Sequence, residues 1–152
     1  MLSPDYSDLL SAFRAHEVRF LVVGAHALGF HGRPRATMDF DVWVEPSAEN
    51  APRVIAALRA FGAPVHGMSE QDFSRPGVGL QIGVAPFRVD ILTLLSGIEF
   101  EQAWPRRVAA TLGDQDCFVI SPRDMLTNKL AAGRPKDLAD ASALQELLKS
   151  GK

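Results

Sequence analysis

The chain contains 152 residues, carries a net charge of -2, and is 47% hydrophobic by residue count. This length predicts a single domain spanning residues 1–152, and the ordinary composition excludes disordered and collagen-like chains. The single cysteine, Cys117, excludes an internal disulfide and a cysteine-rich zinc site. The near-neutral charge also argues against a protein that coats nucleic acid by bulk electrostatics.

The N-terminus does not resemble a targeting segment. Its first ten residues include Asp5 and Asp8 and contain neither a basic region nor an apolar run of secretory type. The nearest apolar run, residues 20–23, is far too short to cross a bilayer. We therefore expect a cytoplasmic protein that does not engage a membrane.

The first half of the chain predicts alternating helices and strands. Ser3 and the proline after it suit a helix start, and a buried strand follows at residues 18–23. The remaining predicted elements are a short helix at 25–30, a strand at 38–44, and a helix that begins within 47–51 and ends at Gly62. Residues 63–77 predict an irregular loop because they are rich in proline, glycine and polar residues.

The second half predicts a hairpin, further short strands and two helices. The hairpin combines residues 78–84 and 87–92, and the short strands cover 107–112 and 117–120. Ser121 caps a helix that runs to about residue 132, and a last helix starts after Gly133. Its expected inward stripe is Leu138, Ala141, Leu144, Gln145 and Leu148. This order predicts an α/β (α+β) domain with a mixed twisted sheet flanked by helices.

Two aspartates in the second strand are the strongest chemical signal. Asp39 and Asp41 alternate with apolar residues, so they share one face of the strand. Like charges this close destabilise each other unless a cation, a proton or a basic side chain intervenes. Oxygen ligands favour Mg²⁺ or Mn²⁺, and Asp90 would join the same face if its strand lies alongside. Trp43 follows on this face, where it would either stack on a base or pack against the protein.

A simpler interpretation of the two aspartates stays open at this point. They would face solvent on an edge strand and pair with nearby arginines, for which the candidates are Arg33, Arg35 and Arg88. Three carboxylates on adjacent strands would instead form a site that can hold two metal ions for in-line phosphoryl transfer.

The residues around the aspartates resemble a known signature. Val22-Val23-Gly24-Ala25, thirteen further residues and then Asp39-Phe40-Asp41-Val42 follow the hG[GS]…[DE]h[DE]h pattern of the polymerase-β-like nucleotidyltransferase superfamily. The string LVVGAHALGFHGRPRATMDFDVWV is similar to the bacterial minimal nucleotidyltransferases and to the type IV abortive-infection (AbiEii-type) toxin nucleotidyltransferases. Arg35-Ala36-Thr37 matches their Arg-x-Thr element. The resemblance implies a nucleotidyltransferase fold.

The resemblance continues toward the C-terminus. Asp90 within Arg88-Val89-Asp90-Ile91 matches the third carboxylate of these families. Gly133-Arg134-Pro135-Lys136-Asp137 together with Asp140 resembles their R-x-K-D-x-x-D element. Ala25 departs from the pattern, because the family has glycine or serine there. A serine contact to phosphate is therefore absent, although the backbone N-H remains.

The family resemblance implies a role for each matched residue. Asp39, Asp41 and Asp90 would bind the metal ions and carry out catalysis, with Asp90 helping to deprotonate the acceptor hydroxyl. Gly24 and Ala25 would approach the phosphates of a nucleoside triphosphate such as ATP. The other candidate nucleotide-binding residues are Arg35, Thr37, Lys129, Arg134, Lys136, Asp137 and Asp140. Within this set, Asp137 and Asp140 would orient the basic side chains or the nucleotide. Lys129 would either reach the nucleotide or be an ordinary exposed lysine.

The implied function is transfer of a nucleoside monophosphate to a hydroxyl of RNA, protein or a small molecule, with release of pyrophosphate. tRNA and a partner protein are the expected macromolecular acceptors, and a helical toxin or antitoxin partner is implied. The alternative is a non-catalytic antitoxin or regulatory partner that keeps the fold for binding. An aminoglycoside-type transferase is a third possibility, weakened because such enzymes generally carry an additional substrate-binding part.

Overall fold

The computed structural model describes residues 2–34, 39–65, 67–83 and 88–150. The predicted positions Arg35 and Thr37 therefore lie outside the described residues. The helices are α1 (Pro4–Ala15), α2 (Gly24–Phe30), α3 (Asn50–Phe61), α4 (Glu70–Phe73), α5 (Phe100–Ala103), the 3-10 turn η1 (Trp104–Arg106), α6 (Pro122–Ala132) and α7 (Pro135–Lys149). The strands are β1 (Phe20–Val23), β2 (Asp39–Val44), β3 (Gly79–Ile82), β4 (Arg88–Leu92), β5 (Val108–Leu112) and β6 (Gln115–Val119).

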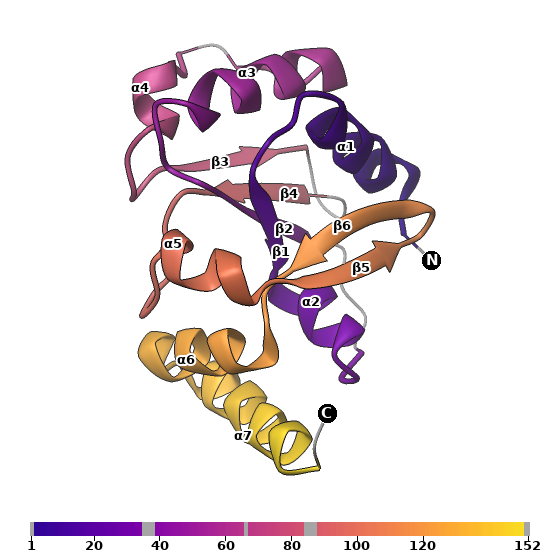
Figure 1. The fold of residues 1–152 in the computed structure, drawn as a ribbon, viewed down its shortest axis with the longest axis vertical. Coiled ribbons are helices and arrows are strands. Elements are labelled where there is room, and N and C mark those ends of the chain that lie inside the picture. Colours follow the sequence, from indigo (N-terminus) through magenta and orange to yellow (C-terminus); the bar gives the residue numbers. More distant parts are fainter. Residues whose placement is uncertain (1, 35–38, 66, 84–87, 151–152) are drawn as a thin grey trace.

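The strands form one mixed sheet in the order β3-β4-β2-β1-β6-β5. β2 lies at its centre, antiparallel to β1 and parallel to β4, and β3 and β5 are the edges. The helices α1 and α3 cover one face, where Phe13 packs edge-to-face on Phe20 and Tyr6 stacks on Phe40. Asp41 and Asp90 project from the opposite face, since the residues next to them in β2 and β4 are buried on the first. α5 packs on Trp43 of that opposite face, and the α6–α7 hairpin lies at the foot of the molecule (Figure 1). The expected mixed α/β sheet flanked by helices is confirmed.

Two short helical segments were not expected from the sequence. α4 lies within residues 63–77, which predicted only a loop, because Ser69 and Asp72 cap each other's backbone in a reciprocal box. The segment that leads to β5 is helical over α5 and η1, where Glu99 and Gln102 form a similar box. Side chains that close such boxes stabilise single turns that hydrophobic periodicity is too short to reveal.

The inward stripe predicted for the last helix was partly wrong. Ala141 and Leu144 are buried as expected, but Leu138 is 48% exposed and Gln145 faces outward. Asp137 and Asp140 turn inward instead, because both carboxylates bond to the buried Lys129. Electrostatic pairing across the α6–α7 hairpin therefore overrides the apolar pattern. Within the described chain, no helix is both long and apolar enough to cross a membrane.

Asn50, at the start of α3, joins three parts of the chain. Its side chain is buried, its Oδ1 accepts from the backbone N-H of Arg19 at 2.8 Å, and its Nδ2 donates to the carbonyls of Arg19 at 3.0 Å and Glu45 at 3.1 Å. These bonds fasten the approach to β1 and the exit from β2 to one helix. One amide side chain thus links the residue before β1, the residue after β2 and the start of α3.

Replacing Asn50 by alanine should destabilise the protein by about 2 to 4 kcal/mol, because buried backbone groups lose their partners. Urea unfolding followed by circular dichroism measures this. Asn128 provides the matched control, since its amide makes one exposed hydrogen bond, to the carbonyl of Ser96. Asn128→Ala should cost about 0.5 kcal/mol, and equal losses in the two variants would contradict the role given to Asn50.

Candidate active site

The register of the central strands brings two carboxylates together. β2 and β4 are parallel and adjacent, and Asp41 lies directly opposite Asp90. Their neighbours Phe40, Val42, Val89 and Ile91 are buried on the other face, so both aspartates project from the same side of the sheet. The two side chains are in hydrogen-bonding contact. Two carboxyl groups in such contact share a proton or require a cation.

Asp41 is poised to give up this proton near neutral pH. Burial is the largest cause of its perturbation, followed by the hydrogen bond and the charge of Asp90, and together they raise the pKa of Asp41 to about 7. The charge of Asp39 acts in the same direction, and the Lys129 ammonium partly opposes it. The ionised pair is therefore costly in the free protein. A divalent cation would remove this cost, and the carboxylate oxygens are the ligands that Mg²⁺ and Mn²⁺ prefer.

Asp39 does not converge with the other two carboxylates. Its Oδ1 accepts from Nε of Arg88 at 3.3 Å, and both side chains are about 40% exposed. The described residues accordingly contain no group of three acidic, histidine or cysteine side chains arranged to hold a metal. Pairing with an arginine, the simpler interpretation of the sequence, holds for Asp39 and does not hold for Asp41.

Gly24 allows the backbone at the start of α2 to approach Asp41 closely. It begins α2 immediately after β1 and has a left-handed backbone with φ of +68°. A methyl group added there would overlap Oδ2 of Asp41, so a residue without a side chain is required for this close approach. Val23 precedes the helix and supplies no side-chain cap, and Ala25 follows in the first turn. The backbone of α2 therefore starts against the carboxylate pair.

Gln81 is a site residue that the sequence analysis missed. It lies on β3 directly opposite Asp90, and its Nε2 donates to Oδ1 of Asp90 at 3.1 Å. The amide therefore holds one oxygen of the carboxylate that faces Asp41. The predicted β3–β4 hairpin was the one sequence feature that could have identified Gln81, because the register of the hairpin determines which side chain faces Asp90.

A buried charge network lies in the α6–α7 hairpin. Nζ of Lys129 is 3.1 Å from Asp140 and 3.5 Å from Asp137, and all three side chains are at least 90% buried. Asp137 also accepts from Nε of Arg134 at 2.6 Å and from its backbone N-H at 3.2 Å. The Arg134 bond is the main reason that the pKa of Asp137 lies below its usual value. Lys129 is therefore not the ordinary exposed lysine that the sequence also allowed.

The predicted basic residues near this network differ in their surroundings. Arg134 bonds Asp137 through Nε and through a terminal nitrogen at 3.2 Å, yet its side chain remains 68% exposed. Lys136 is exposed on the first turn of α7. Lys129 acts on Asp41 electrostatically. Of these three cations, Lys129 is therefore the one whose charge reaches the Asp41–Asp90 pair among the described contacts.

Trp43 packs inside the protein and does not face a ligand. It is 1% exposed and meets Phe100 of α5 edge-to-face at 5.1 Å between ring centroids. Of the two sequence interpretations, packing is therefore the one found. His26, beside Gly24, lies edge-on to Tyr6 and Phe40, and burial is the main reason that its pKa is lowered.

Comparison with known proteins yields structural neighbours only. The chain matches no protein-family model and no curated sequence. Several solved structures align over nearly all of it. The lincomycin-bound lincosamide antibiotic adenylyltransferase LnuA aligns at 15% identity and a TM-score of 0.60, covering 97% of this chain and 98% of that one.

Two further neighbours agree with the first. A Thermotoga maritima protein described as a nucleotidyltransferase aligns at 13% identity and a TM-score of 0.59, over 99% of this chain and 96% of its own. The antibiotic-resistance factor ANT(2″)-Ia aligns at 13% identity and a TM-score of 0.60, over 97% and 83%. The fold implied by the sequence resemblance is confirmed: this chain has a nucleotidyltransferase fold.

Proposed function

We propose that this protein is a metal-dependent nucleotidyltransferase, which moves a nucleoside monophosphate from a nucleoside triphosphate to a hydroxyl acceptor. The observation that carries the proposal is the Asp41–Asp90 pair, two hydrogen-bonded carboxyl groups opposite each other on parallel strands. An exposed ion pair would explain one aspartate, but it does not explain two partly buried carboxyls that face each other beside a glycine turn.

Asp41 and Asp90 would hold the metal. Asp39 would join them as a third ligand if its carboxylate released Arg88 and bound the metal instead. When bound, Mg²⁺ or Mn²⁺ supplies positive charge against the triphosphate and the attacking oxygen. Asp90 takes the proton of the acceptor hydroxyl, and Gln81 holds this carboxylate in place. The hydroxyl oxygen forms a bond to the α-phosphorus while the bond from that phosphorus to the bridging oxygen breaks, and pyrophosphate leaves.

The remaining residues bind and position the nucleotide. The first backbone N-H groups of α2, at Gly24 and Ala25, suit phosphate oxygens. Arg134 and Lys136 are exposed cations for the same anion, and Arg35 and Thr37 stay predictions from the resemblance. Lys129 is held by Asp137 and Asp140, so it positions α6 against α7 and adds a fixed positive charge near Asp41.

A small molecule with a hydroxyl group is the acceptor that the neighbours favour. The sequence argument against an antibiotic-type transferase was the need for an additional substrate-binding part. LnuA removes that objection, because the match covers 98% of its chain without such a part. RNA and protein acceptors and a toxin–antitoxin role stay predictions from the sequence resemblance.

Labelled nucleotide transfer tests the reaction directly. The protein is incubated with each α-labelled triphosphate, Mg²⁺ and hydroxyl-bearing antibiotics, RNA and protein extracts, and the labelled product is identified. Asp90→Asn should lower the transfer rate on the order of 10² to 10⁴-fold, because the base that accepts the hydroxyl proton is lost. Glu101→Gln, at an exposed position on α5, is the matched control and should retain the rate. Equal rates in the wild type and Asp90→Asn would exclude this role.

Metal binding should compete with the shared proton. Because the pKa of Asp41 is about 7, Mg²⁺ should raise the unfolding temperature of the wild type more at pH 8 than at pH 6. Asp41→Asn should lose this Mg²⁺ effect, whereas Glu101→Gln should keep it. Differential scanning calorimetry measures all three proteins. A Mg²⁺ shift that is unchanged in Asp41→Asn would place the cation elsewhere.

The carboxylate pair should also reduce stability in the absence of metal. Asp41 has a raised pKa in the folded state, so the stabilising protonated form is present at low pH and lost as the pH rises from about 4 through about 7. Asp41→Asn should therefore gain about 1 to 3 kcal/mol over the wild type at pH 8, and less at pH 5. Urea unfolding without divalent cations measures the difference, and a gain that does not depend on pH would refute this linkage.

A further inference from the structure

Arg88 lies on the carboxylate face of the sheet, beside the proposed catalytic residues. It is the first residue of β4, it pairs with Asp39 in the parallel β2–β4 register, and Asp90 follows two positions later. Because successive side chains of a strand alternate between its two faces, Arg88 and Asp90 project from the same side. A guanidinium group is therefore built into the surface that carries the three aspartates.

The ion pair between Arg88 and Asp39 is loose. Nε of Arg88 is 3.3 Å from Oδ1 of Asp39, and the two side chains are 39% and 43% exposed. Arg106, by contrast, binds both oxygens of Asp124 at 2.8 to 3.1 Å, and that carboxylate is only 5% exposed. An exposed ion pair is screened by water and contributes little to stability, so Arg88 and Asp39 can exchange partners at small cost.

The backbones of this pair are held in place by two buried or half-buried rings. The hydroxyl of Tyr6, a buried residue of α1, donates to the carbonyl of Arg88 at 3.2 Å. The imidazole of His26, on α2, bonds to the backbone of Asp39. Tyr6 and His26 meet edge-to-face, and both pack on Phe40 of β2. An exchange of partners would therefore move the two side chains and leave the strands in place.

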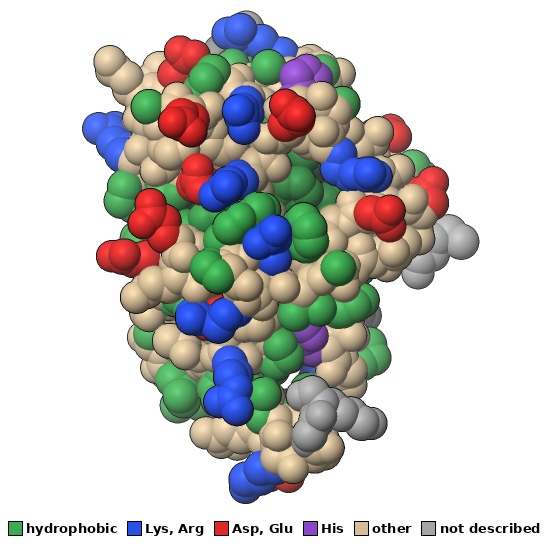
Figure 2. Space-filling view, in the orientation of Figure 1, with side chains coloured by type: hydrophobic (Ala, Val, Ile, Leu, Met, Phe, Trp, Pro, Cys, Tyr) green, Lys and Arg blue, Asp and Glu red, His purple; other side chains and the backbone are tan. Residues whose placement is uncertain are grey.

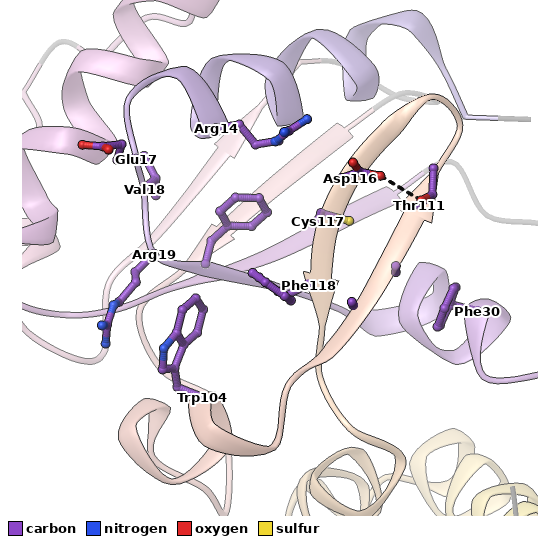
Figure 3. Close-up of a pocket in the computed structure, with 13 residues that line it drawn as sticks. Arg14, Glu17, Val18, Arg19, Phe30, Trp104, Thr111, Asp116, Cys117 and Phe118 are labelled. Carbon is purple, nitrogen blue, oxygen red and sulfur yellow. Dashed lines mark hydrogen bonds between the residues drawn. The ribbon is translucent and has the colours of Figure 1, made fainter.

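Arginines in other parts of the molecule have different surroundings. Figure 2 shows arginine and lysine side chains spread over one face among acidic and hydrophobic ones. Arg14 and Arg19 line a cavity of about 890 Å³, where Arg19 lies over the ring of Trp104 (Figure 3). Arg19 also pairs with Glu45, and the lining of this cavity includes none of the three aspartates. Among the described ion pairs, that of Arg88 is the one formed between the two aspartate-bearing strands.

The charge balance at Arg88 changes when the carboxylates bind a cation. If Asp39 turns to a divalent cation, the guanidinium group of Arg88 loses the carboxylate that compensates its charge. A triphosphate brings several negative charges to the same face, and a guanidinium group binds phosphate oxygens through two parallel N-H donors. The lost ion pair would then be replaced by a charge-assisted contact with the substrate.

We propose that Arg88 is a nucleotide-binding residue that alternates between two anions. In the free protein it pairs with Asp39, and in the loaded protein it contacts the phosphates of the nucleoside triphosphate while Asp39 binds the cation. Arg88 has this role only if the proposed transferase function holds. Removing its charge should change the affinities for metal and for nucleotide in opposite directions, which the loss of an arginine that only stabilises the sheet would not do.

Isothermal titration calorimetry on Arg88→Gln separates the two contacts. Mn²⁺ alone should bind this variant about 2- to 10-fold more tightly than the wild type, because Asp39 has no guanidinium group to release. At saturating Mn²⁺, the nucleotide should bind about 10- to 100-fold more weakly, because a charged hydrogen bond to phosphate is lost. The nucleotide is whichever of ATP, GTP, CTP and UTP binds the wild type most tightly. Arg88→Lys keeps the charge and should recover part of the nucleotide affinity.

Two further variants control for general loss of charge or stability. Arg75→Gln is the matched control, because Arg75 forms an exposed ion pair with Asp72 at 3.4 Å, and both affinities should stay unchanged. In an Asp39→Asn background, Arg88→Gln should no longer tighten Mn²⁺ binding but should still weaken nucleotide binding, since only the first effect acts through Asp39. Circular dichroism confirms that each variant is folded.

The outcomes distinguish this role from the proposed function. A wild type that binds no Mn²⁺ would refute the proposed function and the role of Arg88 together. If the wild type binds Mn²⁺, but Arg88→Gln leaves both affinities unchanged or shifts them in the same direction, the role of Arg88 alone is overturned. Opposite shifts in Arg88→Gln, with none in Arg75→Gln, would support it.

Discussion

The central constraint in this molecule is the contact between Asp41 and Asp90. Parallel pairing of β2 with β4 places them directly opposite each other, and burial raises the pKa of Asp41 to about 7. Other features are adjusted to this pair. Gly24 has no side chain because a methyl group would overlap Asp41, Gln81 donates to Asp90, and Lys129 supplies a positive charge within electrostatic range. The surrounding elements thus support an arrangement that is unfavourable without a proton or a cation.

A buried charge network in the C-terminal helices includes Lys129, the cation that acts on Asp41. Lys129 contacts Asp137 and Asp140, so α6 and α7 are joined by ion pairs where an apolar stripe was expected. Removing one partner from such a network leaves a buried charge uncompensated, which costs far more than an exposed pair contributes. The network therefore fixes the orientation of the hairpin and keeps Arg134, which bonds Asp137, at its surface.

Much of the fold and part of the site were predictable from the sequence. The alternation of apolar and polar residues with a period of two predicted β2, and Gly24, directly after β1, predicted where α2 begins. Both signals depend only on residues that are neighbours in the sequence. The contact of Gln81 was not predictable in the same way, since strand register determines it. Arg88 was one of three candidate partners for the aspartates, and the register of β2 and β4 selects it for Asp39. The inward turn of Asp137 and Asp140 depends on a lysine in another helix. Sequence periodicity records none of these pairings.

Paramagnetic broadening by Mn²⁺ is the most direct test of the central claim. In a nuclear magnetic resonance titration at pH 8, Mn²⁺ should first broaden the backbone amides of Gly24, Asp41 and Asp90, which meet at the carboxylate pair. Excess Mg²⁺ should restore these signals by competition. Broadening that begins at other acidic residues, or that affects the surface evenly, would contradict the assignment of Asp41 and Asp90 as the cation site.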